Sequence, residues 1–206
     1  MLINMAWINN KHETLDATSD TMDTTSMTAS DFGVFLNHGL PSGGEAQTRY
    51  SVNGVDTGSK YAYRSSKNGA GDISNTTSQN NVTYDVGGES DDKFSITYAC
   101  DIAGAEKLFI GFGISRKEAG AGNAPTRAEV FWKYETTSSR VTAVKDETNQ
   151  SLTGTYAIGS NLSCLGDGGT ITTTPLNIQT NSIFETSDTG KHFIWNSSTS
   201  TWTEVA

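Results

Sequence analysis

The sequence is poor in the residues from which metal–thiolate sites and nucleic-acid interfaces are built. Only two cysteines occur among 206 residues, Cys100 and Cys164, and their spacing matches no metal-thiolate motif. Because both lie in apolar, strand-like contexts, we expect two buried free thiols, with a disulfide between them as the alternative. Acidic residues outnumber basic ones by 23 to 14, so binding to a phosphate backbone would gain little from counterion release. We therefore expect no nucleic-acid partner.

Long apolar runs are also missing. No run approaches the length of a transmembrane helix, so we expect no membrane insertion. The opening residues, MLINMAWINNKHETLD, combine a short apolar run with no basic n-region, which argues against a secretory signal. The chain is expected to stay in the cytoplasm where it is made, or to leave by a route that needs no signal.

Motifs for catalysis, cofactors and metals are equally sparse. The histidines His12, His38 and His192 are far apart, and no serine, cysteine or carboxylate motif frames any of them, so we expect structural or surface roles. The acidic residues at 89–92 (ESDD) and Asp167 could offer oxygen ligands to calcium, but such a scattered set is typical of a solvated loop. No glycine-rich stretch has phosphate-loop spacing. The sequence predicts no catalytic residues, no cofactor and no metal.

The chain is rich instead in short segments that alternate with a period of two, which is typical of β-strands. Four such segments follow one another between Lys93 and Asp146: Phe94–Cys100, Lys107–Lys117, Thr126–Tyr134 and Arg140–Lys145. In the second, Leu108, Ile110, Phe112 and Ile114 lie on one face and Phe109, Gly111, Gly113 and Ser115 on the other. No other part of the chain concentrates as many large apolar residues. We therefore expect the core to be built on these strands.

Further strands are expected on both sides of this central stretch, at His12–Asp16, Asp31–His38, Gln47–Asn53, Lys60–Ser65, Val82–Val86, Thr155–Ile158 and Leu162–Leu165. Gln47–Asn53 and Lys60–Ser65 flank a glycine-containing turn, which predicts a hairpin. Between them and the next strand, Lys67–Asn81 is predicted to be a long polar loop.

The last 25 residues predict a small three-stranded meander over Ile183–Glu185, His192–Trp195 and Thr201–Val205. No segment predicts a helix, and 34% hydrophobic residues suit a sheet protein with a thin core. We therefore predict an all-β chain, a jelly-roll-like β-sandwich with a small C-terminal β-meander. Its expected parts are an N-terminal arm with a first edge strand (1–30), the sandwich (31–169), and a linker with the meander (170–206).

One group of residues is a candidate for contact with a glycan or a protein partner. It consists of two aromatic residues and the polar residues beside them in the chain: Tyr61, Tyr63, Arg64, Asn68 and Asp72. Aromatic residues at strand positions can stack on sugars, but more commonly they belong to a core or an interface. Glu129 is the only carboxylate inside a central strand, without a second one at i+2 or i+4. A glycan-cleaving site needs two carboxylates, so we expect Glu129 to pair with Arg127 or Arg140.

Several short motifs occur in a recognisable order between residues 12 and 166. They are Phe35–His38, Arg49–Asn53, Asp56, Lys60–Arg64, Asn68-Gly69, Thr77–Asn80, Glu106–Leu108, Ala119–Arg127 with Glu129, Trp132-Lys133, Thr137-Ser138, Val141-Thr142, Tyr156–Ser160 and Leu165-Gly166. In this order they resemble lectin-like, or concanavalin-like, jelly-roll virion proteins of marine tailed phages and archaeal viruses. The chain departs from that pattern at Cys164-Leu165-Gly166, where an aliphatic residue, tryptophan and glycine are more usual, and in its opening arm. The tail resembles a small β module appended to phage and virus structural proteins.

The resemblance implies a non-enzymatic structural protein on the exterior of a virus particle, made in the host cytoplasm. The expected role is head decoration or a head fibre that binds the major capsid protein or other virion proteins, as a homo-oligomer such as a trimer. The alternative is a tail-fibre or receptor-binding protein that recognises host-surface glycans. The family carries no agreed catalytic residues that could be transferred to this chain.

Overall fold

The computed structural model describes residues 7–43, 47–85, 91–148, 154–167, 183–185, 191–196 and 201–205. These residues form strands and turns without a helix, so the prediction of an all-β chain is confirmed. Within this part of the chain, no helix has the length and apolar character needed to cross a bilayer. The chain divides into two compact units, Met1–Gly168 and Gly169–Ala206, and each is described by itself.

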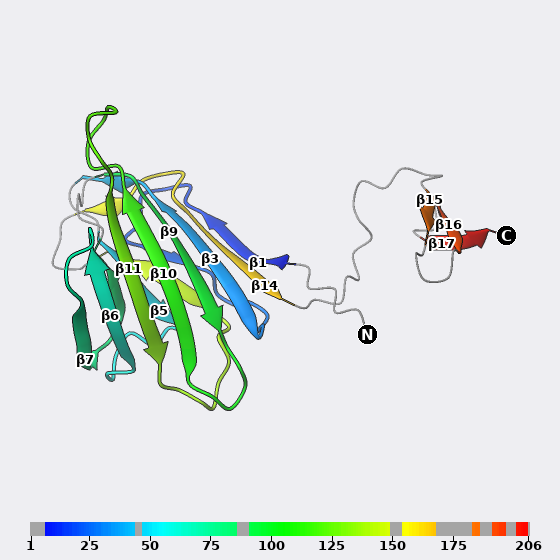
Figure 1. Cartoon of the computed structure of the whole chain (residues 1–206), viewed down its shortest axis with the longest axis horizontal. Helices are drawn as coiled ribbons and strands as arrows, with labels where there is room; N and C mark the ends of the chain where they lie inside the picture. The colour runs from blue at the N-terminus through cyan, green and yellow to red at the C-terminus, as the bar shows by residue number, and fades with distance from the viewer. Residues whose placement is uncertain are drawn as a thin grey trace. The chain divides into compact units, whose positions relative to one another are not determined.

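The first unit is built on an antiparallel sheet of eight strands, in the order β1-β14-β3-β9-β10-β11-β6-β7 (Figure 1). Its strands are β1 (Trp7–Thr14), β3 (Phe32–Gly39), β6 (Tyr61–Lys67), β7 (Ile73–Gln79), β9 (Lys93–Cys100), β10 (Lys107–Ser115), β11 (Thr126–Tyr134) and β14 (Asn161–Asp167). In β10 buried and exposed residues alternate without interruption, as the pleat of a strand requires when one face is covered. The long strands β3, β9, β10 and β11 lie in the middle of the sheet.

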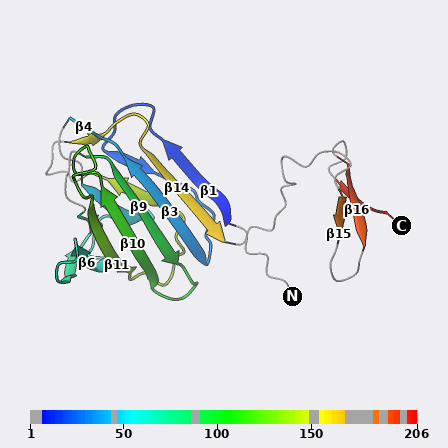
Figure 2. The same cartoon turned by 45° about the horizontal axis from the view of Figure 1, so that its top comes forward.

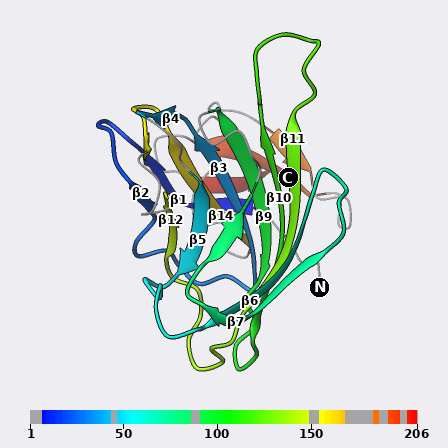
Figure 3. The same cartoon turned by 90° about the vertical axis from the view of Figure 1, so that its left-hand side faces the viewer.

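A second antiparallel sheet packs against one face of the first, and the two form a β-sandwich, as predicted (Figures 2 and 3). Its strands, in spatial order, are β2 (Thr21–Asp23), β12 (Val144–Glu147), β5 (Thr48–Val52) and β8 (Val82–Tyr84). A separate short pair joins β4 (Pro41–Ser42) to β13 (Thr155–Tyr156). Figure 3 shows β2, β12 and β5 as a layer alongside the large sheet.

The fourth predicted strand of the central stretch belongs to a different sheet from the first three. The first three segments form β9, β10 and β11, which pair with one another, whereas β12 begins only at Val144 and pairs with β2 and β5 of the second sheet. The connection between β11 and β12 is held by Asp101, whose Oδ2 accepts hydrogen bonds from Arg140 Nε at 3.1 Å and Val141 N at 2.8 Å. This anchor directs the chain across the sandwich.

The predicted hairpin of Gln47–Asn53 and Lys60–Ser65 is wrong, because β5 belongs to the second sheet and β6 to the first. The turn between them folds against Tyr61, whose hydroxyl accepts a hydrogen bond from Val52 N at 2.8 Å and donates one to Val55 O at 2.7 Å. These bonds satisfy backbone groups that a hairpin ladder would otherwise have paired.

The predicted loop Lys67–Asn81 contains the edge strand β7, which pairs Arg64 with Ser74 and Ser65 with Ile73. A polar sequence is compatible with an edge strand, because such a strand has one partner and remains largely exposed to solvent. The first strand, β1, is also longer than predicted, since it begins at Trp7.

Large side chains of the second sheet fill the core opposite the small residues of β9 and β10. The second sheet contributes large side chains that are at most 1% exposed, among them Met22, Tyr50 and Tyr84. Opposite them, β9 and β10 present small residues, and Gly111 has no room for a side chain, because a Cβ there would lie 1.8 Å from Tyr84 Oη. That hydroxyl is hydrogen-bonded to Thr97 Oγ1 at 2.7 Å and accepts from Trp132 Nε1 at 3.1 Å.

The expectation that the core is built on the central strands is therefore only partly correct. Phe109, Val130 and Trp132 do point into the sandwich and are at most 4% exposed. The larger apolar set of β10, represented by Ile110 and Phe112, points to the opposite face of the sheet. The physical reason is that Tyr50, Tyr84 and their neighbours occupy the interior volume, so the glycine and serine face of β10 must be turned inward.

A buried carboxylate lies between the two sheets. Asp146 on β12 is 0% exposed, and its Oδ2 accepts hydrogen bonds from Tyr156 Oη at 2.9 Å and from Asn37 Nδ2, while its Oδ1 accepts from Arg49 N at 3.1 Å. Burial raises the pKa of Asp146 to about 7, and these donors together with Lys93 oppose the shift. The polar network ties β12 to β3, β5 and β13.

A second buried charge cluster surrounds Asp101 at the end of β9. Lys107, 0% exposed, places its Nζ 3.3 Å from Asp101 Oδ1 and donates a hydrogen bond to Ile102 O at 2.6 Å. Arg140 bridges Asp101 to Asp31, with Nη2 2.8 Å from Asp31 Oδ1. The cluster fixes the β9–β10 turn and the β11–β12 connection to each other.

The second unit contains the three-stranded antiparallel meander that the sequence predicted. Its strands are β15 (Ile183–Glu185), β16 (His192–Asn196) and β17 (Thr201–Val205). Trp195 is buried at 4% exposure, and Lys191, which directly precedes β16, pairs with Glu204 of β17. The predicted linker lies outside the described residues.

Candidate interaction surface

The face of the large sheet that points away from the second sheet carries a continuous set of exposed apolar side chains. Antiparallel register places Ile110 between Tyr98 and Phe131 on neighbouring strands. The outer apolar face, as we name it, consists of eight residues that are each 42–54% exposed: Phe32, Phe94, Tyr98, Leu108, Ile110, Phe112, Ile114 and Phe131. They come from β3, β9, β10 and β11, which lie side by side in Figure 1. No described strand of the first unit covers this face.

The outer apolar face is large for a protein surface. A large aromatic residue carries roughly 150–250 Å² of surface, so eight residues exposed by nearly half present roughly 500–800 Å². The largest apolar patch of a typical monomer measures about 300–600 Å², and a larger one usually marks a site of interaction. Half-buried Leu36, Ile96, Cys100 and Leu165 extend the same face towards β14.

The charged side chains at the border of this face are already paired with one another. Lys133 Nζ lies 2.8 Å from Glu106 Oε2, and Arg64 Nη1 lies 3.2 Å from Asp72 Oδ2. Glu129 lies 3.8 Å from Arg127, which is the pairing expected for that carboxylate. Each of the three pairs joins one positive and one negative side chain, so the excess of negative charge, −9 for the chain, does not lie at this border.

The five residues that the sequence nominated for a contact do not form one surface site. Tyr61 is 2% exposed and stacks on Tyr134 in the core, so it cannot touch a surface ligand. Asn68 supports the turn after β6, where it has φ 52° and accepts a hydrogen bond from Arg127 N at 2.9 Å. Arg64 and Asp72 pair with each other, and Tyr63 is half-buried.

Two of the nominated residues nevertheless border a shallow, open hollow. Tyr63 and Arg64 share it with Leu108, Phe131 and Lys133, so the hollow is continuous with the outer apolar face. Because Tyr63 is the register partner of inward-facing Trp132, the outward aromatic ring at the hollow is that of Phe131. With a guanidinium and an ammonium group beside it, this ring can stack on and hydrogen-bond to a sugar or a polar side chain. The hollow therefore belongs to the same candidate surface.

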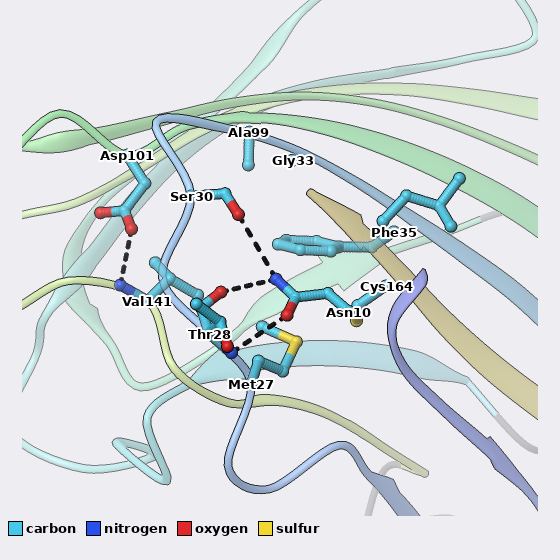
Figure 4. Close-up of a pocket in the computed structure, with 11 residues that line it drawn as sticks. Asn10, Met27, Thr28, Ser30, Gly33, Phe35, Ala99, Asp101, Val141 and Cys164 are labelled. Atoms are coloured by element: carbon cyan, nitrogen blue, oxygen red, sulfur yellow. Dashed lines mark hydrogen bonds between the residues drawn. The ribbon is translucent and has the colours of Figure 1, made fainter. Parts of the chain in front are cut away.

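A small, partly open cavity of about 20 Å³ lies beneath β1 and β14 (Figure 4). Its wall is held by Asn10, which donates from Nδ2 to Thr28 O at 2.5 Å and accepts at Oδ1 from Thr28 N at 3.0 Å. Met27, Phe35 and Cys164 supply apolar lining. The volume suits a single water molecule, so we assign the cavity to structure and not to a ligand.

Within the described part of the chain, the side chains around His12 in β1 come closest to a catalytic arrangement. His12 lies on an exposed strand surface, with Nδ1 2.7 Å from Ser163 Oγ and Nε2 2.7 Å from Thr14 Oγ1. A nucleophilic triad needs a carboxylate beside the histidine, and the hydroxyl of Thr14 cannot stabilise an imidazolium as a carboxylate does. The three residues therefore lack the chemistry of such a triad. Among the described residues, no group of three or more histidine, cysteine or acidic residues is arranged to hold a metal ion.

The two cysteines are free, as expected, but only Cys164 is fully buried. Cys164 pairs in register with Phe35 on the inner side of the sheet, whereas Cys100 is the register partner of Phe32 and Leu108 on the outer side. Thiols on opposite faces of one sheet cannot form a disulfide. Burial raises the pKa of the Cys164 thiol to about 12, so it remains protonated and unreactive at neutral pH.

The outer apolar face was missed by reasoning from sequence, although a signal was present. Strand β10 alternates large apolar residues with Gly111, Gly113 and Ser115, and either face of such a strand can be the buried one. The choice depends on whether the opposing sheet brings small or large side chains. Tyr50 and Tyr84 in short flanking strands were the clue that large side chains arrive from the other side.

Comparison of the chain with protein-family models, curated proteins and solved structures found no match. The resemblance to jelly-roll virion proteins thus depends on the order of short motifs alone.

Proposed function

We propose that this chain is a non-enzymatic structural protein of the exterior of a virus particle, and that it acts through assembly. The observation that carries the proposal is the outer apolar face, roughly 500–800 Å² of apolar surface on the four central strands. Such a surface is costly to leave in water and is stabilised by contact with another protein. The motif resemblance supplies the virion context.

Within this class the favoured role is head decoration, or a head fibre, attached to the lattice of the major capsid protein. A protein carried in many copies stabilises a particle when it binds assembled subunits in preference to free ones. The acidic excess of 23 over 14 residues keeps such a protein soluble before assembly. A particle that lacked the protein but kept its heat resistance would contradict this stabilising role.

The test is the copy number of the chain in purified virus particles, measured by quantitative mass spectrometry against the major capsid protein. A count in the hundreds, in a simple ratio to capsid subunits, is the expected result. A count of about a dozen would move the protein to the tail or a vertex. Absence from the particle would overturn the proposal.

A second candidate is a receptor-binding protein that recognises host-surface glycans, and the open hollow beside Tyr63 and Arg64 favours it. On a glycan array, binding that is lost in Arg64→Ala and kept in Arg116→Ala would support this role. Arg116 is a suitable control because it is exposed and pairs with acidic residues away from the hollow. No binding to any glycan at high protein concentration would remove the candidate.

A further inference from the structure

We propose that the outer apolar face pairs with the same face of a second copy of this chain, in a twofold sheet-on-sheet dimer. The inference deepens the proposed function, on which it rests, because it names the partner of the assembly surface. It also replaces the trimer expected from the resemblance, since a single self-complementary face closes with one partner, whereas a trimer needs two different patches.

The area of the face matches what a stable dimer requires. Specific interfaces bury about 800 Å² on each partner, and the outer apolar face with its half-buried border offers an area close to this value. The part of the face formed by β9 and β10, around Ile110 and Tyr98, contains no charged residue, whereas the charged side chains lie along β11, where Glu129 is the register partner of Phe112, and at the sheet border. An apolar centre with a polar border is the usual anatomy of a homodimer interface.

The geometry of the strands favours a copy of the same sheet. Strands β9 and β10 project apolar residues outward at every second position over their length. Two sheets pack face to face at about 10 Å when their twists match, and two copies of one sheet have the same twist. The outward side chains of one copy can then interdigitate with those of the other.

Charge also favours a second copy over a partner of opposite charge. The chain carries a net charge of −9, which would repel its own copy if it were concentrated at this face. The border charges are instead paired, Lys133 with Glu106 and Arg64 with Asp72, so there is neither repulsion of a like face nor attraction for an acidic or basic one. Apolar self-association is the interaction that this distribution permits.

The first test is the mass of the purified full-length chain in solution, by analytical ultracentrifugation over a range of micromolar concentrations. We expect twice 22.0 kDa. Ile110→Asp puts one charge into each half of the dimer centre and should weaken association at least about 100-fold. Phe131→Lys repeats the test at the neighbouring position with the opposite charge. Circular dichroism should show that both variants stay folded, because both positions are exposed in the monomer.

The matched control is Ile158→Asp, the same substitution at an isoleucine that is 62% exposed and lies between β13 and β14, outside the outer apolar face. It should leave the dimer unchanged. Equal weakening by Ile110→Asp and Ile158→Asp would overturn the proposal, because the effect would then follow from charge alone. A trimeric mass would overturn it as well.

Cys100 provides an independent probe of whether the face is covered. It lies beside Phe32 and Leu108 and should react with a maleimide slowly in the dimer and quickly in Ile110→Asp, while Cys164 stays unreactive. A monomeric chain with reactive Cys100 would overturn the dimer. A monomeric chain with protected Cys100 would also overturn it, and would indicate that another part of the same chain covers the face.

The two proposals fail in different ways. A chain that is monomeric in solution but abundant on particles would refute the dimer and leave the virion role in place. A dimer that is absent from particles would refute the virion role and leave the dimer in place.

Discussion

The two faces of the large sheet differ in what fills them. On β9 and β10 the inner face carries small residues such as Thr97 and Gly111, which leave space for Tyr50 and Tyr84 from the second sheet. The outer face of the same two strands carries most of their large apolar side chains, such as Ile110 and Phe112, and no described strand of the first unit covers them. Hydrophobicity alone therefore does not determine which face of a sheet lies inside. The volume supplied by the opposing layer decides it.

The largest effect should come from exchanging phenylalanine for alanine on each face. Phe109→Ala on the inner face removes a ring that is 2% exposed and stacks on Trp132 at a centroid distance of 3.5 Å. It should lower the free energy of unfolding by about 5 kcal/mol. Phe112→Ala, on the outer face of the same strand, should cost less than about 1 kcal/mol in the monomer. Urea denaturation at low protein concentration measures both, and equal losses would refute the assignment of faces.

A buried charge pair and an exposed one should differ in the same way. Asp101→Asn breaks a pair with Lys107 in which both side chains are at most 3% exposed, and should cost about 4 kcal/mol because an ammonium group stays buried. Glu106→Gln breaks the exposed pair with Lys133 and should change the free energy of unfolding by less than about 0.5 kcal/mol. A thermal melt of each variant decides the matter. An Asp101→Asn variant with an unchanged melting temperature would show that water replaces Asp101 as the partner of Lys107.

The buried carboxyl of Asp146 predicts a pH dependence that surface carboxyls lack. Its pKa is raised to about 7 in the folded protein from 3.8, so the folded state holds a proton that the unfolded chain releases. The stability that this proton contributes is present below pH 4 and is lost as the pH rises to 7, about 4 kcal/mol. In urea titrations from pH 4 to 8, Asp146→Asn should remove this decline. An unchanged slope would assign the proton to another group.

The smallest effect concerns the space under Tyr84. Gly111→Ala forces the hydroxyl of Tyr84 away from Thr97 and Trp132 and should cost about 2 kcal/mol. Gly122→Ala is the matched control, since a Cβ there meets nothing within 4 Å. The denaturation midpoint should fall only for Gly111→Ala. Equal midpoints for the two variants would mean that the inner face has space for a Cβ at position 111.

Much of the strand pattern was predictable from sequence because alternation with a period of two is local. The segments forming β3, β9, β10 and β11 were placed correctly, as were the three strands of the C-terminal meander. The hairpin of β5 and β6 was not, because the sequence reads the same whether two strands pair or face each other across a sandwich. β7 was missed because an exposed edge strand needs no apolar residues.

The candidate surface was less predictable than the fold. Sequence reasoning nominated Tyr61 for a surface contact because aromatic residues at strand positions are ambiguous, and the structure places it in the core. Arg64 and Asp72, which border the outer apolar face, were also nominated. The residues that form that face were not. Outward-facing Ile110 and Phe112 look like core residues in any linear pattern.

The sequence by itself determined the all-β class, the places where strands form and the charge of −9, because alternation and composition are properties of neighbouring residues. Only the tertiary structure decided which sheet each strand joins and which face of the large sheet is inside. Those choices depend on volumes brought together from distant parts of the chain, such as Tyr84 above Gly111. The same choice left the outer apolar face exposed.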